Sequence, residues 1–430
     1  MSIWTTLFTG SSGIAAHGEA IGVVGDNIAN ISTVGFQSSR AGFEDILGGA
    51  SSNGQRLGTG VAMGGTQTNF SQGSLQETGR NLDLAIRGKG FFAVKGSHDG
   101  LPGTYFSRDG RFNIGKDGLL VNQEGLRVQG YTIDPSGGVS PSTGDLNVQA
   151  QSQPRASTQV SLIANLDASA ATPAVQPFAA ANAVQTSNFS TSTNVFDSLG
   201  VEHRIDTYFV KTGAGAWAWH ALVDGGQLTG GAAGTPTEVA TGTLNFTNGG
   251  ALNTQLPAGT QNLNFAGAAQ AQPVRFSFGD DLATAGGTGL KGVTQFSGES
   301  RVKDVTQDGF SAGDLLEVSV GQDGIITGHF SNGQSRSVAR VALATFAGEE
   351  GLRRVGNQLF GTSTASGAAV LAAASTGSRG SIAAGTTESS NVDLGLELVT
   401  LIQYQRAFQA SSKTVSTADE MLQELTSLKR

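Results

Sequence analysis

The 430-residue sequence contains no cysteine and few charged residues. Without cysteine the chain cannot form disulfides, use a catalytic thiol or hold a metal through thiolates. Charged residues make up 14% of the sequence, where about a quarter is typical. The net charge is −8 and no basic cluster occurs. This argues against a nucleic-acid partner, because such binding depends on Lys and Arg side chains that neutralise phosphates.

The sequence also lacks a long apolar run and a basic N-terminal segment. No stretch approaches the ~18 consecutive apolar residues that a membrane-spanning helix requires. The first basic residue is Arg40, so the start of the chain lacks the positive region of a secretory signal peptide. We therefore expect no membrane insertion, and if the protein leaves the cytoplasm we expect a route that does not use a cleavable signal peptide.

Common motifs of catalysis and of metal or phosphate binding are missing as well. The five histidines have no H-x-x-x-H or H-E-x-x-H spacing, and the sequence contains no G-x-S-x-G or G-x-x-x-x-G-K-[ST] motif. His203 and Asp206 could form a hydrolytic pair, but no nucleophile accompanies them. We therefore predict that the protein is not an enzyme and has no cofactor or metal.

Glycine is abundant, with 63 residues, about twice the usual share. This composition favours β domains rich in turns. Asp-Gly pairs supply the positive φ angles of hairpin turns. The pairs that divide predicted strands are Asp109-Gly110, Asp117-Gly118 and Asp323-Gly324.

Charges become sparse between Pro141 and Leu290, which indicates a separate, inserted domain. Its strands are predicted at 207–210, 217–223 and 274–278, where apolar and polar residues alternate. The segments on either side are also rich in strands, and we expect them to complete one sheet domain together.

Apolar residues recur every seven positions at both ends of the chain. A sustained seven-residue repeat keeps an apolar seam facing a partner helix, as in coiled coils. We expect these seams to pack against each other or against other copies of the chain, as in a polymerising subunit. The predicted polymerisation seam comprises Leu7, Ile14, Ile21, Ile28, Leu394, Leu398, Leu401, Phe408, Val415 and Leu422.

The C-terminal helix is predicted from Val392 to Leu428, with a capping box between Ser390 and Asp393. Five glycines interrupt the N-terminal helix, each at a cost of up to about 1 kcal/mol relative to Ala. That helix is expected to become ordered on assembly, where small residues also let neighbouring backbones approach closely. The alternative is a pair of ordinary amphipathic helices within a monomer.

Three stretches of the sequence resemble the rod and hook family of bacterial flagellar axial proteins. The first runs from Asp26 to Phe36, the second covers 78–92 with Ser107 to Gly110, and the third covers 390–422. The inserted domain favours the hook members of this family over the rod members. The signature positions that carry the resemblance are Asn27, Asn30, Thr33, Gly35, Phe36, Gln405 and Arg406.

Pattern and resemblance together predict a mainly β fold with long terminal α-helices, arranged as nested domains. The terminal helices would form a coiled-coil inner domain, with two β-rich domains outside it. The predicted parts are a helical domain (1–35 and 388–430), a compliant connecting linker (36–70 and 367–387), a β-rich domain (71–145 and 292–366) and an inserted outer β domain (146–291).

The resemblance implies a structural subunit that polymerises into a curved hollow tube and transmits torque as a universal joint. It also implies rod proteins, hook-filament junction proteins, a hook cap and the flagellar type III export apparatus as partners, and a location in the extracellular hook-basal body. Two alternatives remain open from the sequence. One is a distal rod or hook-junction protein, and the other is a β-rich surface adhesin, which would not need paired terminal seams.

Overall fold

The chain forms two compact units, one inserted into the other. The computed structural model describes residues 3–50, 56–134, 137–148, 151–257 and 259–427. Unit 1 comprises Met1–Ala150, Leu315–His329 and Ser335–Arg430, and unit 2 comprises Gln151–Asp314 and Phe330–Gln334. The insertion therefore extends beyond the predicted boundary at 291, because the strand that follows this boundary pairs within unit 2.

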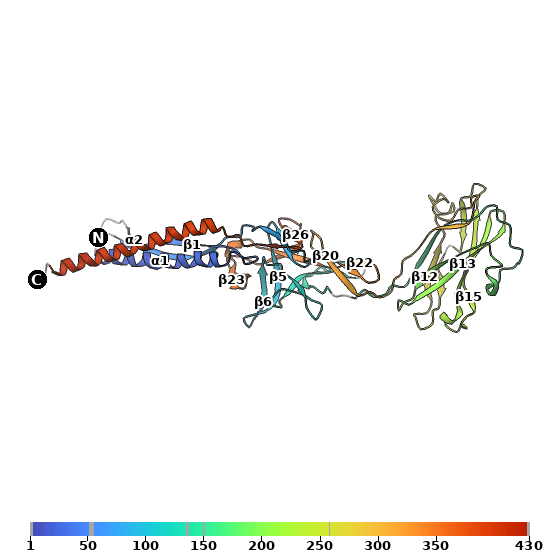
Figure 1. Ribbon diagram of the computed structural model, residues 1–430, viewed down its shortest axis with the longest axis horizontal. Helices are drawn as coiled ribbons and strands as arrows, with labels where there is room; N and C mark the ends of the chain where they lie inside the picture. The colour runs from blue at the N-terminus through green and yellow to red at the C-terminus, as the bar shows by residue number, and fades with distance from the viewer. Residues whose placement is uncertain (1–2, 51–55, 135–136, 149–150, 258, 428–430) are drawn as a thin grey trace. The chain divides into compact units, whose positions relative to one another are not determined.

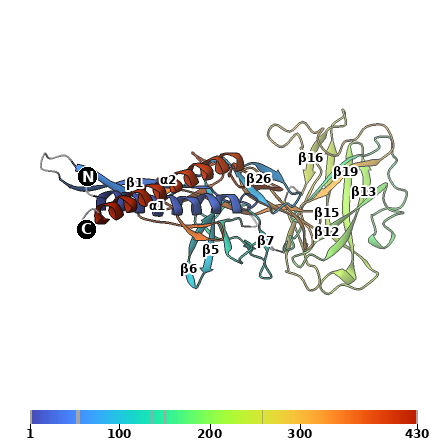
Figure 2. The ribbon, with the colours of Figure 1, turned by 60° about the vertical axis from the view of Figure 1, so that its left-hand side comes forward.

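Two long helices carry the ends of unit 1. Helix α1 spans Ile3–Ala29 and helix α2 spans Leu394–Ser427, and they lie side by side (Figures 1 and 2). The carboxylate of Asp393 accepts hydrogen bonds from the N–H groups of Gly395 and Leu396, at 2.9 and 3.2 Å. Asp393 is therefore the N-cap of α2, and the prediction that placed the cap at Ser390 was wrong.

The segment 36–70 forms a β-hairpin rather than the predicted linker. Strand β1 (Ser39–Ala50) pairs antiparallel with β2 (Arg56–Thr68), and both contact α1. The Gly, Ser and Asn content suggested a compliant connection, but backbone pairing across the hairpin satisfies the polar groups of this segment. The predicted linker 367–387 likewise contains paired strands. They are β25 (Val370–Ala373), β26 (Ser381–Ala384) and β27 (Thr386–Glu388).

Strands from both sides of the insertion build the β-rich part of unit 1, as predicted. The described residues form a 12-stranded sheet in which β22 pairs with β5 and β9, and two further pairs join β4 to β26 and β3 to β27. The strands of the 12-stranded sheet are β5 (Phe91–His98), β6 (Leu101–Ser107), β7 (Asn113–Ile114), β8 (Leu120–Val121), β9 (Arg127–Thr132), β10 (Gly144–Asp145), β20 (Leu315–Val320), β21 (Ile325–Phe330), β22 (Ser335–Thr345), β23 (Arg353–Gly356), β24 (Leu359–Gly361) and β25 (Val370–Ala373). The two pairs are formed by β3 (Leu75–Glu77), β4 (Leu84–Arg87), β26 (Ser381–Ala384) and β27 (Thr386–Glu388).

The Asp-Gly pairs of unit 1 differ in their structures. Gly118 and Gly324 have φ values of +76° and +82° and follow an Asp between paired strands, as predicted. Gly110, in contrast, does not have a positive φ. A Cβ there would lie 1.8 Å from the carbonyl oxygen of Leu84, so this glycine is required by close backbone packing instead.

The described residues of unit 2 form a five-stranded antiparallel sheet and a four-stranded sheet that share one apolar core. Trp217 and Trp219 are buried at its centre, and the three strands predicted for this region are all present. The strands are β11 (Gln159–Asn165), β12 (Phe189–Phe196), β13 (Glu202–Gly213), β14 (Ala216–Asp224), β15 (Pro236–Phe246), β16 (Leu252–Leu256), β17 (Gln261–Leu263), β18 (Gln272–Ser277) and β19 (Arg301–Gln307).

Candidate assembly surface

Small residues bring the two terminal helices into close contact. A Cβ added at Gly10 would lie 2.6 Å from Cγ2 of Val415, and one added at Gly13 would lie 2.6 Å from Oγ of Ser411. Gly18 approaches Phe408, and Asn27 bonds to Glu397, so the helices run antiparallel. The buried face of α1 comprises Gly10, Gly13, Ala16, Ala20, Val24 and Asn27.

The predicted seam lies beside this buried face and is only partly covered within one subunit. Leu7, Ile14, Ile21 and Ile28 of α1 and Leu401, Val415 and Leu422 of α2 are half-buried, whereas Leu394, Leu398 and Phe408 are exposed. The row of small residues was not predicted as a contact, because its glycines were interpreted chiefly as a weakness of the helix. The seven-residue spacing of Gly13, Ala20 and Asn27 was the available signal.

Further large apolar side chains on the helices are exposed in the single subunit. Exposed apolar side chains also occur on the β-rich part of unit 1, but more of them lie on the helix pair that carries the predicted seam. This surface resembles an interface, because monomeric proteins seldom leave contiguous apolar area uncovered. The exposed residues are Trp4, Phe8, Leu394, Leu396, Leu398, Val399, Ile402, Phe408 and Met421.

The β1–β2 hairpin is fastened along α1 by hydrogen bonds. The hydroxyl of Ser12 accepts from the N–H of Val61 at 3.2 Å, and the hydroxyl of Thr9 donates to the carbonyl of Thr59 at 3.1 Å. Rings of His17, Phe43 and Tyr404 lie 5.3 to 6.2 Å apart, so α1, β1 and α2 meet in one cluster. The hairpin therefore extends the rigid helical part rather than loosening it.

Asn27, one of the signature residues, joins three elements at the end of the helix pair. Its buried amide donates to the carbonyl of Ser39 at 2.7 Å and accepts from the Ser39 N–H at 2.9 Å. The same amide donates to Oε1 of Glu397 at 3.0 Å. Burial raises the pKa of Glu397, and the hydrogen bond from Asn27 opposes that rise.

The other N-terminal signature residues form the turn that follows α1. Asn30 bonds back to Asp26 and accepts from the hydroxyl of Thr33 at 3.1 Å. Gly35 has a φ of +70°, and a Cβ there would lie 2.5 Å from the N of Asp109. Only glycine fits this conformation and this space. The N-terminal signature residues therefore form the junction between helix and sheet.

A buried ion pair lies at the same junction. Oε2 of Glu388 lies 3.3 Å from Nη1 of Arg108, and the two side chains are 0% and 3% exposed. Oε1 of Glu388 accepts from the N–H of Gly73 at 3.0 Å. Asn391 accepts from the N–H of Ser38 and donates to the carbonyl of Asn69 at 2.7 and 2.8 Å. These bonds connect the start of α2 to both ends of the hairpin segment and to the sheet.

Arg354 on β23 holds the end of α1 from the sheet side. Its guanidinium donates to Oγ of Ser39 at 3.0 Å, lies 3.6 Å from Oδ2 of Asp26 and stands 4.7 Å from the centre of the Phe36 ring. Phe36 is buried. The contact is a cation–π interaction combined with an ion pair, so the position of β23 controls how the helix end is held.

His98 fixes the strand that carries Arg354. Its Nε2 lies 3.0 Å from the carbonyl oxygen of Val355 and its Nδ1 lies 3.0 Å from Oε2 of Glu124. Both partners are acceptors, so both bonds form only when the imidazole carries two protons. The bond to Val355 raises the pKa of His98, burial opposes this rise, and Glu124 and Asp99 add to it.

We expect unit 1 to lose stability as the pH rises above the ordinary histidine range. Because the pKa of His98 is raised in the folded state, its contribution is fully present below the unfolded pKa of about 6.5 and is lost as pH rises through the folded pKa. Amide exchange of 353–356, measured between pH 6 and 9 and corrected for the intrinsic pH effect, should accelerate. In His98→Gln that excess acceleration should disappear, and its persistence would contradict the role of His98.

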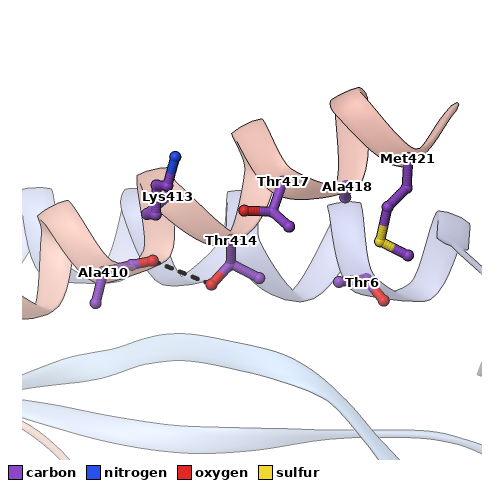
Figure 3. Close-up of a pocket in the computed structure, with 7 residues that line it drawn as sticks. All are labelled: Thr6, Ala410, Lys413, Thr414, Thr417, Ala418 and Met421. Atoms are coloured by element: carbon purple, nitrogen blue, oxygen red, sulfur yellow. Dashed lines mark hydrogen bonds between the residues drawn. The ribbon is translucent and has the colours of Figure 1, made fainter. Parts of the chain in front are cut away.

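The C-terminal signature residues Gln405 and Arg406 are exposed on α2. They lie away from the junction formed by the N-terminal signature. A second feature of α2 is an open groove of about 410 Å³, lined by Thr6 of α1 and six residues of α2 (Figure 3). Those residues are Ala410, Lys413, Thr414, Thr417, Ala418 and Met421.

His203 pairs with Asp197 and not with Asp206, the partner considered for hydrolysis. Nε2 of His203 lies 3.0 Å from Oδ2 of Asp197, while Asp206 bonds to Arg204. Burial would raise the pKa of Asp197, but hydrogen bonds from His203 and from the N–H groups of Val201 and Leu199 hold it below its ordinary value. His203 stacks on Phe265 with ring centres 3.9 Å apart, so this pair stabilises the turn after β12.

Comparison with known proteins agrees with this architecture. A model of the flagellar basal body protein FlaE D2 domain matches 165–310, and a model of the flagellar hook protein FlgE/F/G D1 domain matches 85–162. The flagella basal body rod protein model matches 7–37, and the flagellar basal body rod FlgEFG protein C-terminal model matches 383–428. The flagellar hook protein FlgE of Escherichia coli (strain K12) is 33% identical over 97% of this chain and 98% of its own length. The chain belongs to the flagellar hook protein family.

A second hook protein aligns over nearly the whole chain, and a solved structure is similar to part of it. The flagellar hook protein FlgE of Treponema pallidum (strain Nichols) is 33% identical over 99% of both chains. The crystal structure of Helicobacter pylori flagellar hook protein FlgE2 is 14% identical, covers 71% of this chain and 98% of its own, and has a TM-score of 0.47. Within the described residues of this hook protein family member, no helix is long and apolar enough to cross a membrane.

Proposed function

We propose that the chain is a structural subunit of the bacterial flagellar hook, which polymerises into a curved hollow tube and transmits torque from the rod to the filament. The observation that carries this proposal is the exposed apolar surface on a closely packed helix pair, in a chain whose full length aligns with hook proteins. Contacts in which different surfaces meet and the rotation does not close generate open helical polymers.

The polymerisation seam predicted from the sequence forms the core of this proposal. Its half-buried and exposed residues flank the contact between α1 and α2, so neighbouring copies would complete their burial. The helix pair and the hairpin would form the inner wall, and the two β-rich parts would lie outside. Few charges and many small polar residues would keep the outer contacts exchangeable as the curved tube rotates.

Several partners follow from this role and are part of the proposal. The subunit would contact rod proteins at one end of the tube, hook-filament junction proteins at the other, and a hook cap during growth. It would reach the cell exterior through the flagellar type III export apparatus, without a cleavable signal peptide. A distal rod or hook-junction protein is less well supported, because unit 2 matches a D2 domain model and the full-length relatives are named hook proteins.

Sedimentation of the purified chain tests the proposal. We expect the full-length chain to form pelletable polymers, and a variant without residues 1–30 to remain in the supernatant. Near-ultraviolet circular dichroism should still report folded unit 2, since Trp217 and Trp219 are buried there. Pelleting of the truncated variant to the same extent as the full-length chain would overturn the proposed role of the helices. An adhesin would keep its surface binding after this truncation.

A further inference from the structure

Two features of the helix pair have matching chemistry but lie on different sides of α1. One is the groove described above, to which α1 contributes Thr6. The other is the exposed aromatic pair Trp4 and Phe8. Residues four apart share a helix face, so these two rings form one apolar surface. Residues two apart are separated by about 200° around a helix, so this aromatic surface points away from the groove.

The groove has the properties of a site for an aromatic ring. The residues that line it are mainly Ala and Thr, with the side chain of Met421 directed toward Thr6 and Lys413 about two turns away along α2 (Figure 3). Sulfur–aromatic contacts and cation–π contacts both stabilise a bound ring. Met421 is 50% exposed, so its side chain is accessible to an incoming group.

Trp4 is a large aromatic side chain that such a site could bury. It is 73% exposed, whereas the other two tryptophans of the chain are 0% and 1% exposed in unit 2. Tryptophan is enriched among the residues that dominate binding energy at interfaces. The single subunit leaves this ring in solvent, and a neighbouring surface could bury its large apolar area.

We propose that Trp4 and Phe8 of one subunit pack into the α2 groove of a second copy of this chain, with the Trp4 ring against Met421 and the Phe8 ring on the side toward Lys413. This inference rests on the proposed function, because it assigns a specific contact within the polymer. The ring and the groove lie on different sides of the helix pair, so each subunit offers one half of the contact to each of two neighbours. Such a heterologous contact propagates.

The alignment of the helices indicates a sideways contact. Gly10 lies opposite Val415 and Gly18 lies opposite Phe408. Continuing this antiparallel alignment places Trp4 at the level of Met421, at the same end of the pair. A neighbour displaced sideways, with a small shift along the helix axis, therefore brings its Trp4 to the groove. An arrangement in which neighbouring helix pairs stack end to end along the axis would not bring Trp4 to the groove.

Disulfide trapping tests this contact, because the natural chain contains no cysteine. Trp4→Cys and Met421→Cys are made in separate chains, mixed in equal amounts, polymerised and oxidised mildly. Each chain then carries one thiol, so a disulfide between positions 4 and 421 joins two subunits. Leu396→Cys replaces Met421→Cys in the control, since Leu396 lies on α2 at the other end of the pair and is 61% exposed.

We expect the 4–421 disulfide to exceed the 4–396 disulfide at least tenfold in the polymer and to be absent from the unpolymerised mixture. Equal yields of these two disulfides would overturn the inference. So would a 4–4 disulfide that forms in polymers of Trp4→Cys alone as readily as the 4–421 disulfide forms in the mixed polymer. Tryptophan emission of the natural chain gives a second measurement that requires no cysteine variant. It should move to shorter wavelength on polymerisation, and should not move in Trp4→Phe. An unchanged emission in sedimented natural polymer would also overturn the contact, whereas failure of the natural chain to sediment would contradict the proposed function itself.

Discussion

Replacement of Glu388 by Ala is expected to destabilise unit 1 by about 3–5 kcal/mol, the usual effect of removing one partner of a buried ion pair. The guanidinium of Arg108 would remain 3% exposed without its carboxylate, and the N–H of Gly73 would lose its acceptor. A buried charge without a partner costs far more than the pair contributes while it is intact. Denaturant unfolding of the unpolymerised subunit, followed by far-ultraviolet circular dichroism, measures the change.

An exposed ion pair of the same unit provides the matched control. Arg127 lies 3.0 Å from Asp145, but its side chain is 54% exposed. Surface pairs contribute about 0–1 kcal/mol, so Arg127→Ala should leave the transition of unit 1 nearly unchanged. Tryptophan fluorescence reports mainly on unit 2, which both variants should leave intact. If Glu388→Ala lowered the free energy of unfolding of unit 1 by less than about 1 kcal/mol, water would have to reach the guanidinium of Arg108.

Replacement of Gly10 by Val is expected to separate the helix pair and to abolish polymerisation. The new Cβ would lie 2.6 Å from Cγ2 of Val415 and 3.3 Å from the carbonyl oxygen of Ser411. Rotation of the Val415 side chain can relieve the first contact, but the second involves a backbone atom, and the two γ-methyl groups of the new valine add further bulk at the same place. Overpacking of this kind costs about 1–3 kcal/mol. Sedimentation measures assembly, and far-ultraviolet circular dichroism of the soluble fraction measures the loss of helix.

The same substitution about three helical turns further along α1 serves as its control. A Cβ at Gly22 would meet nothing within 4 Å in the subunit. Gly22→Val should therefore keep or slightly raise the helix content, since glycine is the poorer helix former by a few tenths of a kcal/mol. If Gly10→Val also kept its helix content and sedimented normally, the close approach of α1 and α2 would not be required for assembly.

Local patterns predicted much of the fold and part of the candidate surface. The seven-residue repeats located both helices, and the sparse charges located the insertion. Alternation of apolar and polar residues located β13, β14 and β18. These signals were readable because each depends on the spacing of neighbouring residues in one element. The half-buried seam remains a prediction, since the residues that would cover it belong to other copies.

The errors arose where partners are distant in sequence. The segment 36–70 had the composition of a linker, yet β1 and β2 pair with each other and are held by Ser12 and Asn27 of α1. The insertion extends to Asp314 because β19 pairs with β11, more than a hundred residues earlier. Asp393 replaces Ser390 as the cap of α2, and Ser390 precedes the helix by four residues.

The sequence by itself determined the terminal helices, the β-rich interior, the nested order and the membership of the axial family, because helix periodicity, turn chemistry and signature residues are local. The tertiary structure alone decided which row of α1 is buried, what the signature residues hold together and which aromatic side chains remain exposed. Those features depend on how closely two distant helices approach. Glycine at positions 10 and 13 weakens an isolated helix, but it is also what allows the second helix to come near enough to complete it.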